Sequence, residues 1–103
     1  MRGLPDLAGA LVLTLLSGPA WSAGNPERGR QLADRWCASC HLVGPEQREA
    51  SADVPSFASV ARRDDLSEAL LAAFLTNPHP PMPNMSLTRQ EIADVLAYIR
   101  GLR

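Results

Sequence analysis

The hydrophobic and polar positions of the chain predict a helix at each end of its main part. The first follows the capping residue Asn25, begins at Pro26 and runs into a cysteine-containing stretch. The last follows a capping box that begins at Thr88, and its apolar positions recur at intervals of three and four, namely Ile92, Val95, Leu96 and Ile99. A glycine inside a helix costs about 1 kcal/mol relative to alanine. Gly29 therefore favours a close crossing of these two helices, at which Tyr98 could be the crossing residue. The alternative is a glycine that the helix merely tolerates.

Two shorter helices are predicted between them. Residues 56–61 have the length of one or two turns, with Phe57 and Val60 facing inward. A longer helix starts after the cap Ser67 and ends before Pro78, because the residue preceding a proline avoids helical geometry. Its apolar stripe is expected to consist of Leu70, Leu71, Phe74 and Leu75. Together the four segments predict an all-α fold.

Two segments lack any helical pattern. Residues 42–55 contain Gly44-Pro45 and four charged side chains, which predicts a solvated connection. Residues 77–86 contain four prolines and should form a stiff, extended loop. Stiffness lowers the entropy cost of holding a side chain in place, so this loop is suited to presenting a ligand.

The candidate chemistry is concentrated in Cys37-Ala38-Ser39-Cys40-His41. Two cysteines three positions apart can reach the two vinyl groups on one edge of a porphyrin and form thioethers. The histidine that follows then lies beneath the ring, with an imidazole nitrogen aimed at the iron. The pattern indicates covalent c-type haem attachment, in which Cys37 and Cys40 bind the porphyrin and His41 binds the iron.

Other uses of the two cysteines have to be weighed against this interpretation. A Cys-x-x-Cys pair can also be a thiol redox pair, half of a zinc site or a disulfide. A redox pair of the thioredoxin kind belongs in a βαβ context, which this sequence does not show. A structural zinc ion needs four ligands, whereas the chain has two cysteines and two histidines in all. Haem attachment is therefore the favoured interpretation.

The N-terminal residues have the pattern of an export signal. A positive start precedes an uninterrupted apolar run, residues 7–16, which is too short to span a membrane. Small residues follow, so we predict cleavage after Ser22 or Ala23. Residues 1–23 are thus predicted to be a secretory signal peptide and residues 24–103 a single haem-binding domain in the periplasm, since covalent haem attachment is extracytoplasmic in bacteria. The alternative is an uncleaved N-terminal anchor.

The charge of the chain bears on its partners, and its size bears on its stability. The formal net charge is −1 and all ten basic residues are arginines, so neither nucleic acid nor an anionic membrane surface is indicated as a partner. A domain this small buries only a small core, and a covalently bound porphyrin would supply the additional stabilisation that it needs. The adjacent Arg62 and Arg63 fit either of two roles, as partners of the haem propionates or as a solvated charged turn.

Three side chains of the proline-rich loop are candidates for the sixth iron ligand. Met82 is the first choice, because Pro81 and Pro83 fix the backbone on both sides of it. Met85 is the second choice, and His79 or an open site comes third. A thioether is a soft, neutral ligand, so a histidine–methionine site has a raised reduction potential.

From about residue 25 to residue 103 the chain resembles small bacterial class I cytochromes c. The resemblance is carried by Gly29 in the first helix, the 37–41 motif, Met82-Pro83 and the last helix from Leu87 to Ile99. It implies an all-α fold of three main helices and a short one, wrapped around one covalently bound haem c. It also implies a low-spin iron held by His41 and Met82, and one-electron transfer.

Three functions follow, in order of preference. The first is a diffusible periplasmic electron carrier, which is not an enzyme, is a monomer, has no membrane span after processing and docks transiently with redox partner proteins. The second is a haem c electron-transfer subunit of a larger periplasmic oxidoreductase. The third is a haem enzyme or gas sensor with an open iron position, which is less favoured because the sequence shows no pairing of a nucleophile with a base.

Overall fold

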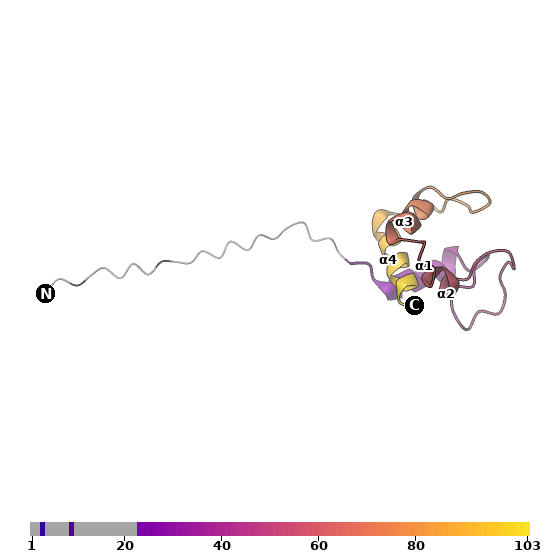
Figure 1. The fold of residues 1–103 in the computed structure, drawn as a ribbon, viewed down its shortest axis with the longest axis horizontal. Helices are drawn as coiled ribbons and strands as arrows, with labels where there is room; N and C mark the ends of the chain where they lie inside the picture. Colours follow the sequence, from indigo (N-terminus) through magenta and orange to yellow (C-terminus); the bar gives the residue numbers. More distant parts are fainter. Residues whose placement is uncertain (1–2, 4–8, 10–22) are drawn as a thin grey trace.

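The computed structural model describes residues 23–103 together with Gly3 and Gly9. Nearly all of the predicted signal peptide lies outside the described residues, so that segment stays a prediction. The described chain forms four helices, α1 (Pro26–Trp36), α2 (Phe57–Ala61), α3 (Glu68–Thr76) and α4 (Arg89–Arg100) (Figure 1). It contains no strand between residues 23 and 103, which confirms the predicted all-α fold. None of the described helices reaches the length and apolarity of a membrane span.

The helices begin at the predicted caps. The side chain of Asn25 accepts hydrogen bonds from two backbone N–H groups in the first turn of α1, at 3.0 and 3.1 Å. Ser67 does the same once for α3. Thr88 Oγ1 accepts from the N–H of Glu91 at 3.1 Å and Glu91 Oε1 accepts from the N–H of Thr88 at 2.9 Å, which completes the capping box of α4. Each cap of this kind is worth about 1 kcal/mol.

α1 and α4 make the most extensive helix–helix contact, and they cross at Gly29. A Cβ atom added at Gly29 would lie 1.9 Å from the backbone oxygen of Asp94 and 2.9 Å from the Cβ of Tyr98. The two backbones are therefore closer than any side chain at position 29 would permit. The predicted crossing of Gly29 by Tyr98 is confirmed.

A buried carboxylate fastens the start of α1 to α4. The side chain of Asp94 is 1 % exposed, and its Oδ1 accepts hydrogen bonds from the backbone N–H of Asn25 at 2.8 Å and from Gln90 Nε2 at 2.9 Å. Arg28 places its Nε 3.7 Å from Asp94 Oδ2. This cluster could not be predicted from the sequence, because spacing alone marks Asp94 as one more polar position of an amphipathic helix.

The hydrophobic core lies where α1, α2 and α4 meet. Its buried members are Ala33, Cys37, Val43, Phe57, Val95 and Ile99. Val60 is partly buried and packs against this cluster, so the predicted inward direction of α2's two apolar residues is confirmed. The core includes a residue of the attachment motif, Cys37, so the fold and the candidate site share atoms.

α3 forms where it was predicted, but its apolar stripe is not buried as expected. It has no buried residue, and Leu70 is 40 % exposed rather than part of a buried stripe. Its other large apolar residues line a cavity described below, namely Leu71, Phe74 and Leu75. The helix is apolar on most of its sides, so residue spacing could not select the face. In Figure 1, α3 and the loop after it lie on one side of the domain, and α2 with residues 42–55 lies on the other.

Candidate haem-binding site

The attachment motif forms a helical turn at the end of α1. Cys37 caps the helix, and its carbonyl oxygen accepts hydrogen bonds from the N–H groups of Cys40 and His41 at 3.1 and 2.9 Å. Cys37 is buried and Cys40 is exposed, and the two sulfurs are not joined to each other. The turn therefore presents one sulfur inside the fold and one at its surface.

The surroundings of these cysteines do not support a thiol redox pair or a zinc site. Burial raises the pKa of Cys37 to about 11, with a smaller contribution from neighbouring Cys40. Redox-active cysteines have lowered pKa values, because the thiolate is the reactive form. Within the described part of the chain, no three or more metal-binding side chains gather as a zinc site would require.

His41 is held by a backbone carbonyl. Its Nδ1 lies 2.6 Å from the carbonyl oxygen of Pro55, and its ring packs 5.3 Å from that of Phe57. A carbonyl oxygen can only accept, so Nδ1 is the donor, and in the neutral imidazole Nε2 then has the lone pair. Metal-binding histidines are oriented in this way, with one nitrogen held by a carbonyl and the other free to coordinate. The role of Pro55 could not be predicted from the sequence, because any residue can supply a backbone carbonyl acceptor.

The segment after the motif is more ordered than a solvated connection, and that prediction is wrong for its first part. Val43 is 2 % exposed, and its N–H donates to Gln47 Oε1 at 2.9 Å. Gln47 Nε2 donates to the carbonyls of Ala38 and His41 at 2.7 and 2.8 Å. The hydroxyl of Tyr98 donates to the carbonyl of Val43. One glutamine and one tyrosine thus hold the backbone on the His41 side of the site.

Two adjoining cavities face the motif, with volumes of about 360 and 250 Å³. Their linings share five residues: Cys37, His41, Pro55, His79 and Met82. The larger is completed by residues that include Trp36, Val54 and Met85, and the smaller by the core residue Phe57 together with the apolar face of α3. The walls are mainly apolar, with one carboxylate from Asp53 and one guanidinium from Arg63. A flat apolar group attached to the motif would be enclosed by them.

The structure brings the candidate sixth ligands to these cavities in different ways. Met82 and His79 line both cavities, whereas Met85 lines the larger one. Just beyond Met85, Ser86 has a φ of 54°, the left-handed region, and its N–H donates to Asn84 Oδ1 at 2.8 Å. Of the two methionines, Met82 is the one that lines both cavities, as His41 also does.

The two arginines of the α2–α3 turn are placed differently from a pair of propionate ligands. Arg63 binds Asp65 through two hydrogen bonds, at 3.0 and 2.7 Å, and Arg62 is exposed. This favours the charged-turn alternative for Arg63. Pairing of Arg62 with a haem propionate stays a prediction.

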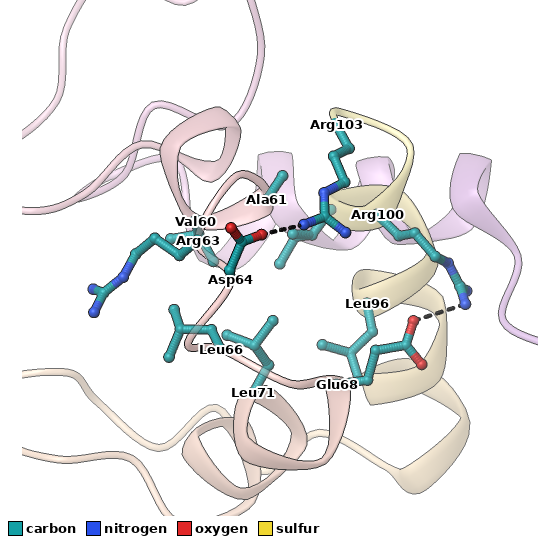
Figure 2. A pocket seen from close by; sticks show the side chains of 11 residues that line it. Val60, Ala61, Arg63, Asp64, Leu66, Glu68, Leu71, Leu96, Arg100 and Arg103 are labelled. Carbon is teal, nitrogen blue, oxygen red and sulfur yellow. Dashed lines mark hydrogen bonds and ion pairs between the residues drawn. The ribbon is translucent and has the colours of Figure 1, made fainter.

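A third cavity, of about 190 Å³, adjoins the smaller one and opens to the surface between α3 and the end of α4 (Figure 2). Two ion pairs bridge it: Arg103 to Asp64 at 2.8 Å and Arg100 to Glu68 at 2.7 Å. Both pairs are exposed, so each contributes no more than about 1 kcal/mol. They connect α3 and the turn before it to the C-terminal end of α4.

Comparisons with known proteins decide the family. Residues 24–99 match the family model described as cytochrome c oxidase, cbb3-type, subunit III. The chain is 54 % identical over 94 residues to cytochrome c-552 of Bradyrhizobium diazoefficiens, with 90 % of each chain covered. The chain belongs to the cytochrome c family. It is also 30 % identical over 79 residues to a cytochrome c-553-like protein of Synechocystis sp., covering 77 % of this chain and 70 % of that one. No solved structure matches it.

A small monohaem cytochrome c has a covalently bound haem c as its cofactor and carries electrons. The observed site fits that group. Two cysteines stand at the edge of a mainly apolar cavity, and the histidine beside them has its Nε2 free. The haem would supply the one-electron chemistry when bound; Cys37 and Cys40 are the residues that could attach it, His41 is a residue that could ligate its iron, and the apolar lining could enclose it.

Proposed function

We propose that the protein is a periplasmic one-electron carrier whose haem is attached through Cys37 and Cys40 and ligated by His41 Nε2 and Met82 Sδ. The observation that carries this proposal is the shared lining of the two cavities. Met82 and His41 both face each of them, and Cys37 lies at their common edge. Met85, the second choice, borders the larger cavity.

Each ligand has a distinct effect on the iron. The hydrogen bond from His41 Nδ1 to the carbonyl of Pro55 holds the imidazole in one orientation and makes Nε2 a stronger donor. The Met82 thioether is neutral and favours the ferrous state, which raises the reduction potential. If His41 and Met82 both bound the iron of the haem, no position would stay open to a substrate, and the protein would exchange electrons without making or breaking bonds in a substrate.

Partners are proposed to dock at the edge of the site where the attachment motif meets the surface. Cys40 is exposed there, and the adjoining Trp36 is 43 % exposed, with the guanidinium of Arg35 5.0 Å from its ring. Transient redox complexes bury small interfaces, in keeping with a monomer that binds one partner and then another. The predicted signal peptide, residues 1–23, would direct the chain to the periplasm.

The experiment that tests the ligand assignment is an optical spectrum of the oxidised holoprotein with Met82→Ala. We expect the weak near-infrared band that arises from methionine-to-iron charge transfer to be present in the parent protein and lost in the variant. The ferrous parent should bind carbon monoxide poorly at neutral pH, because its axial positions are filled. Strong binding by the parent would favour the open-site alternative.

Met85→Ala is the matched control, because it removes the other thioether of the same loop. The band should survive this change with its intensity unaltered. A band that survives Met82→Ala and disappears in Met85→Ala would move the ligand from Met82 to Met85.

A second candidate function is a haem subunit of a larger oxidoreductase, since the matching family model is described as an oxidase subunit. The free-carrier proposal predicts that protein tagged at its C-terminus and purified from its own host elutes from size exclusion at the mass of a monomer. A stable partner in a fixed stoichiometry, retained through about 0.5 M salt, where surface electrostatics are screened, would support the subunit instead.

A further inference from the structure

His79 lies at the iron site without a role in the proposed carrier. It lines both cavities with His41 and Met82. The chain has two histidines and no lysine, so His79 is the one imidazole or amine side chain available to the iron apart from His41. A nitrogen base on the same walls as the proposed methionine ligand is a candidate for the same coordination position.

Two contacts position the His79 ring. It packs edge-on against the ring of Phe74 on α3, with centroids 5.5 Å apart and an interplanar angle of 85°. Its Nδ1 lies 3.2 Å from the carbonyl oxygen of Pro80. Because that oxygen can only accept, Nδ1 is the donor in this contact, and in the neutral imidazole Nε2 then has the lone pair. His41 Nδ1 meets the carbonyl of Pro55 in the same way, so as neutral imidazoles both histidines would bind a metal through Nε2.

The backbone that carries His79 and Met82 is loosely attached to the rest of the domain. Four prolines between residues 78 and 83 have no N–H group to donate. One backbone–backbone hydrogen bond is seen for residues 78–87 in the described structure, from the N–H of Met82 to the carbonyl of His79 at 2.9 Å. This bond joins the two ends of one turn, so a shift of the turn moves both side chains along the same walls. Segments with so few bonds to the rest of a fold move at low free-energy cost.

We propose that His79 is a second, alternative axial ligand of the haem iron, which binds through Nε2 when the methionine thioether leaves. This inference rests on the proposed function, in which Met82 is the resident ligand. The exchange breaks one iron–sulfur bond and forms one iron–nitrogen bond. The imidazole binds as the neutral tautomer, so no proton or electron has to be supplied. A second imidazole favours the ferric state more than a thioether does, so the exchange would lower the reduction potential.

The test uses holoprotein in which both loop methionines are replaced by leucine, Met82→Leu together with Met85→Leu. Leucine keeps the apolar volume of methionine and removes the sulfur. We expect the ferric iron of this variant to remain low-spin at neutral pH, as seen by optical and electron paramagnetic resonance spectra, because His79 occupies the position. Adding His79→Ala should convert the iron to high-spin. It should also tighten carbon monoxide binding to the ferrous protein about tenfold or more. The reason is that the double leucine variant would bind carbon monoxide only while His79 is dissociated, and a site open a tenth of the time binds with about a tenth of the affinity.

The control is His79→Ala with both methionines in place, which should keep the methionine charge-transfer band. The proposal is wrong if the double leucine variant is already high-spin, or if adding His79→Ala changes neither the spin state nor the carbon monoxide affinity. Failure of the Met82 assignment has a different signature, since the charge-transfer band would then survive Met82→Ala alone. Because the double leucine variant lacks both thioethers, it tests His79 whichever methionine is the resident ligand.

Discussion

Replacing both motif cysteines, Cys37→Ser together with Cys40→Ser, is expected to give exported protein with no covalently added tetrapyrrole mass. A serine hydroxyl does not form the thioether that a cysteine sulfur forms with a vinyl group. Intact-mass spectrometry of protein from a host competent in haem attachment measures this directly. The parent should carry the added mass on every molecule, and the double variant should carry it on none.

The same variant should also lose most of its cooperative folding. A domain of this length is stable by only about 5–15 kcal/mol, and α3 has no buried residue among the protein's own side chains. We expect far-ultraviolet circular dichroism to show a large loss of helix relative to the parent. Ser39→Ala, which changes the exposed residue between the cysteines, is the control and should keep both the haem and the helix content. Full haem mass on the double serine variant would contradict covalent attachment at this motif.

Gly29→Ala is expected to destabilise the folded protein by about 3 kcal/mol or more. The new Cβ would lie 1.9 Å from the backbone oxygen of Asp94, so the α1 and α4 backbones would have to move apart. Overpacking a tight contact costs about 1–3 kcal/mol, occasionally more, and here the atom in the way is backbone and cannot rotate aside. The gain in helix propensity, about 1 kcal/mol, is smaller than this cost. Denaturant unfolding of the holoprotein, followed by circular dichroism, measures the change.

Gly101→Ala is the matched control for that experiment. A Cβ at Gly101 would meet its nearest neighbour, the carbonyl oxygen of Tyr98, at 3.4 Å, which is an ordinary contact, and the residue has a φ of −68°. Its stability should stay within about 1 kcal/mol of the parent, with a gain as the expected direction, because alanine restricts the unfolded chain. If Gly29→Ala unfolds at the same denaturant concentration as the parent, the close approach of the terminal helices is wrong.

The parts of the fold that the sequence predicted correctly are those set by neighbours along the chain. Helix starts depend on a side chain and an N–H group two or three residues away, so Asn25, Ser67 and Thr88 could be recognised as caps. The close crossing at Gly29 could be predicted because a glycine inside a helix lowers its stability and so indicates a packing requirement. The buried face of α3 was predicted incorrectly, because its apolar residues surround the helix, and Leu70 lies on the exposed side.

The parts that the sequence could not predict depend on contacts between distant residues. Asp94 lies inside because the N–H of Asn25, 69 positions away, donates to it. Gln47 looks like one more polar residue in a charged loop, yet it holds two carbonyls beside the attachment motif. For the site, five contiguous residues were enough to predict the cofactor. The choice between Met82 and Met85 depends on which cavity walls they reach, which only a three-dimensional arrangement gives.

The two faces of the proposed haem pocket differ in stiffness. The backbone around His41 is pinned by Gln47, by the carbonyl of Pro55 and, through Val43, by a hydroxyl from α4. The opposite face is carried by a helix without buried residues and a turn with one backbone hydrogen bond. Thermal fluctuations should therefore loosen the Met82 side first. His41 and the bonds from Cys37 and Cys40 would meanwhile hold a bound porphyrin against the core. The side that carries His41 would stay fixed, and the side that carries Met82 would be free to move relative to it.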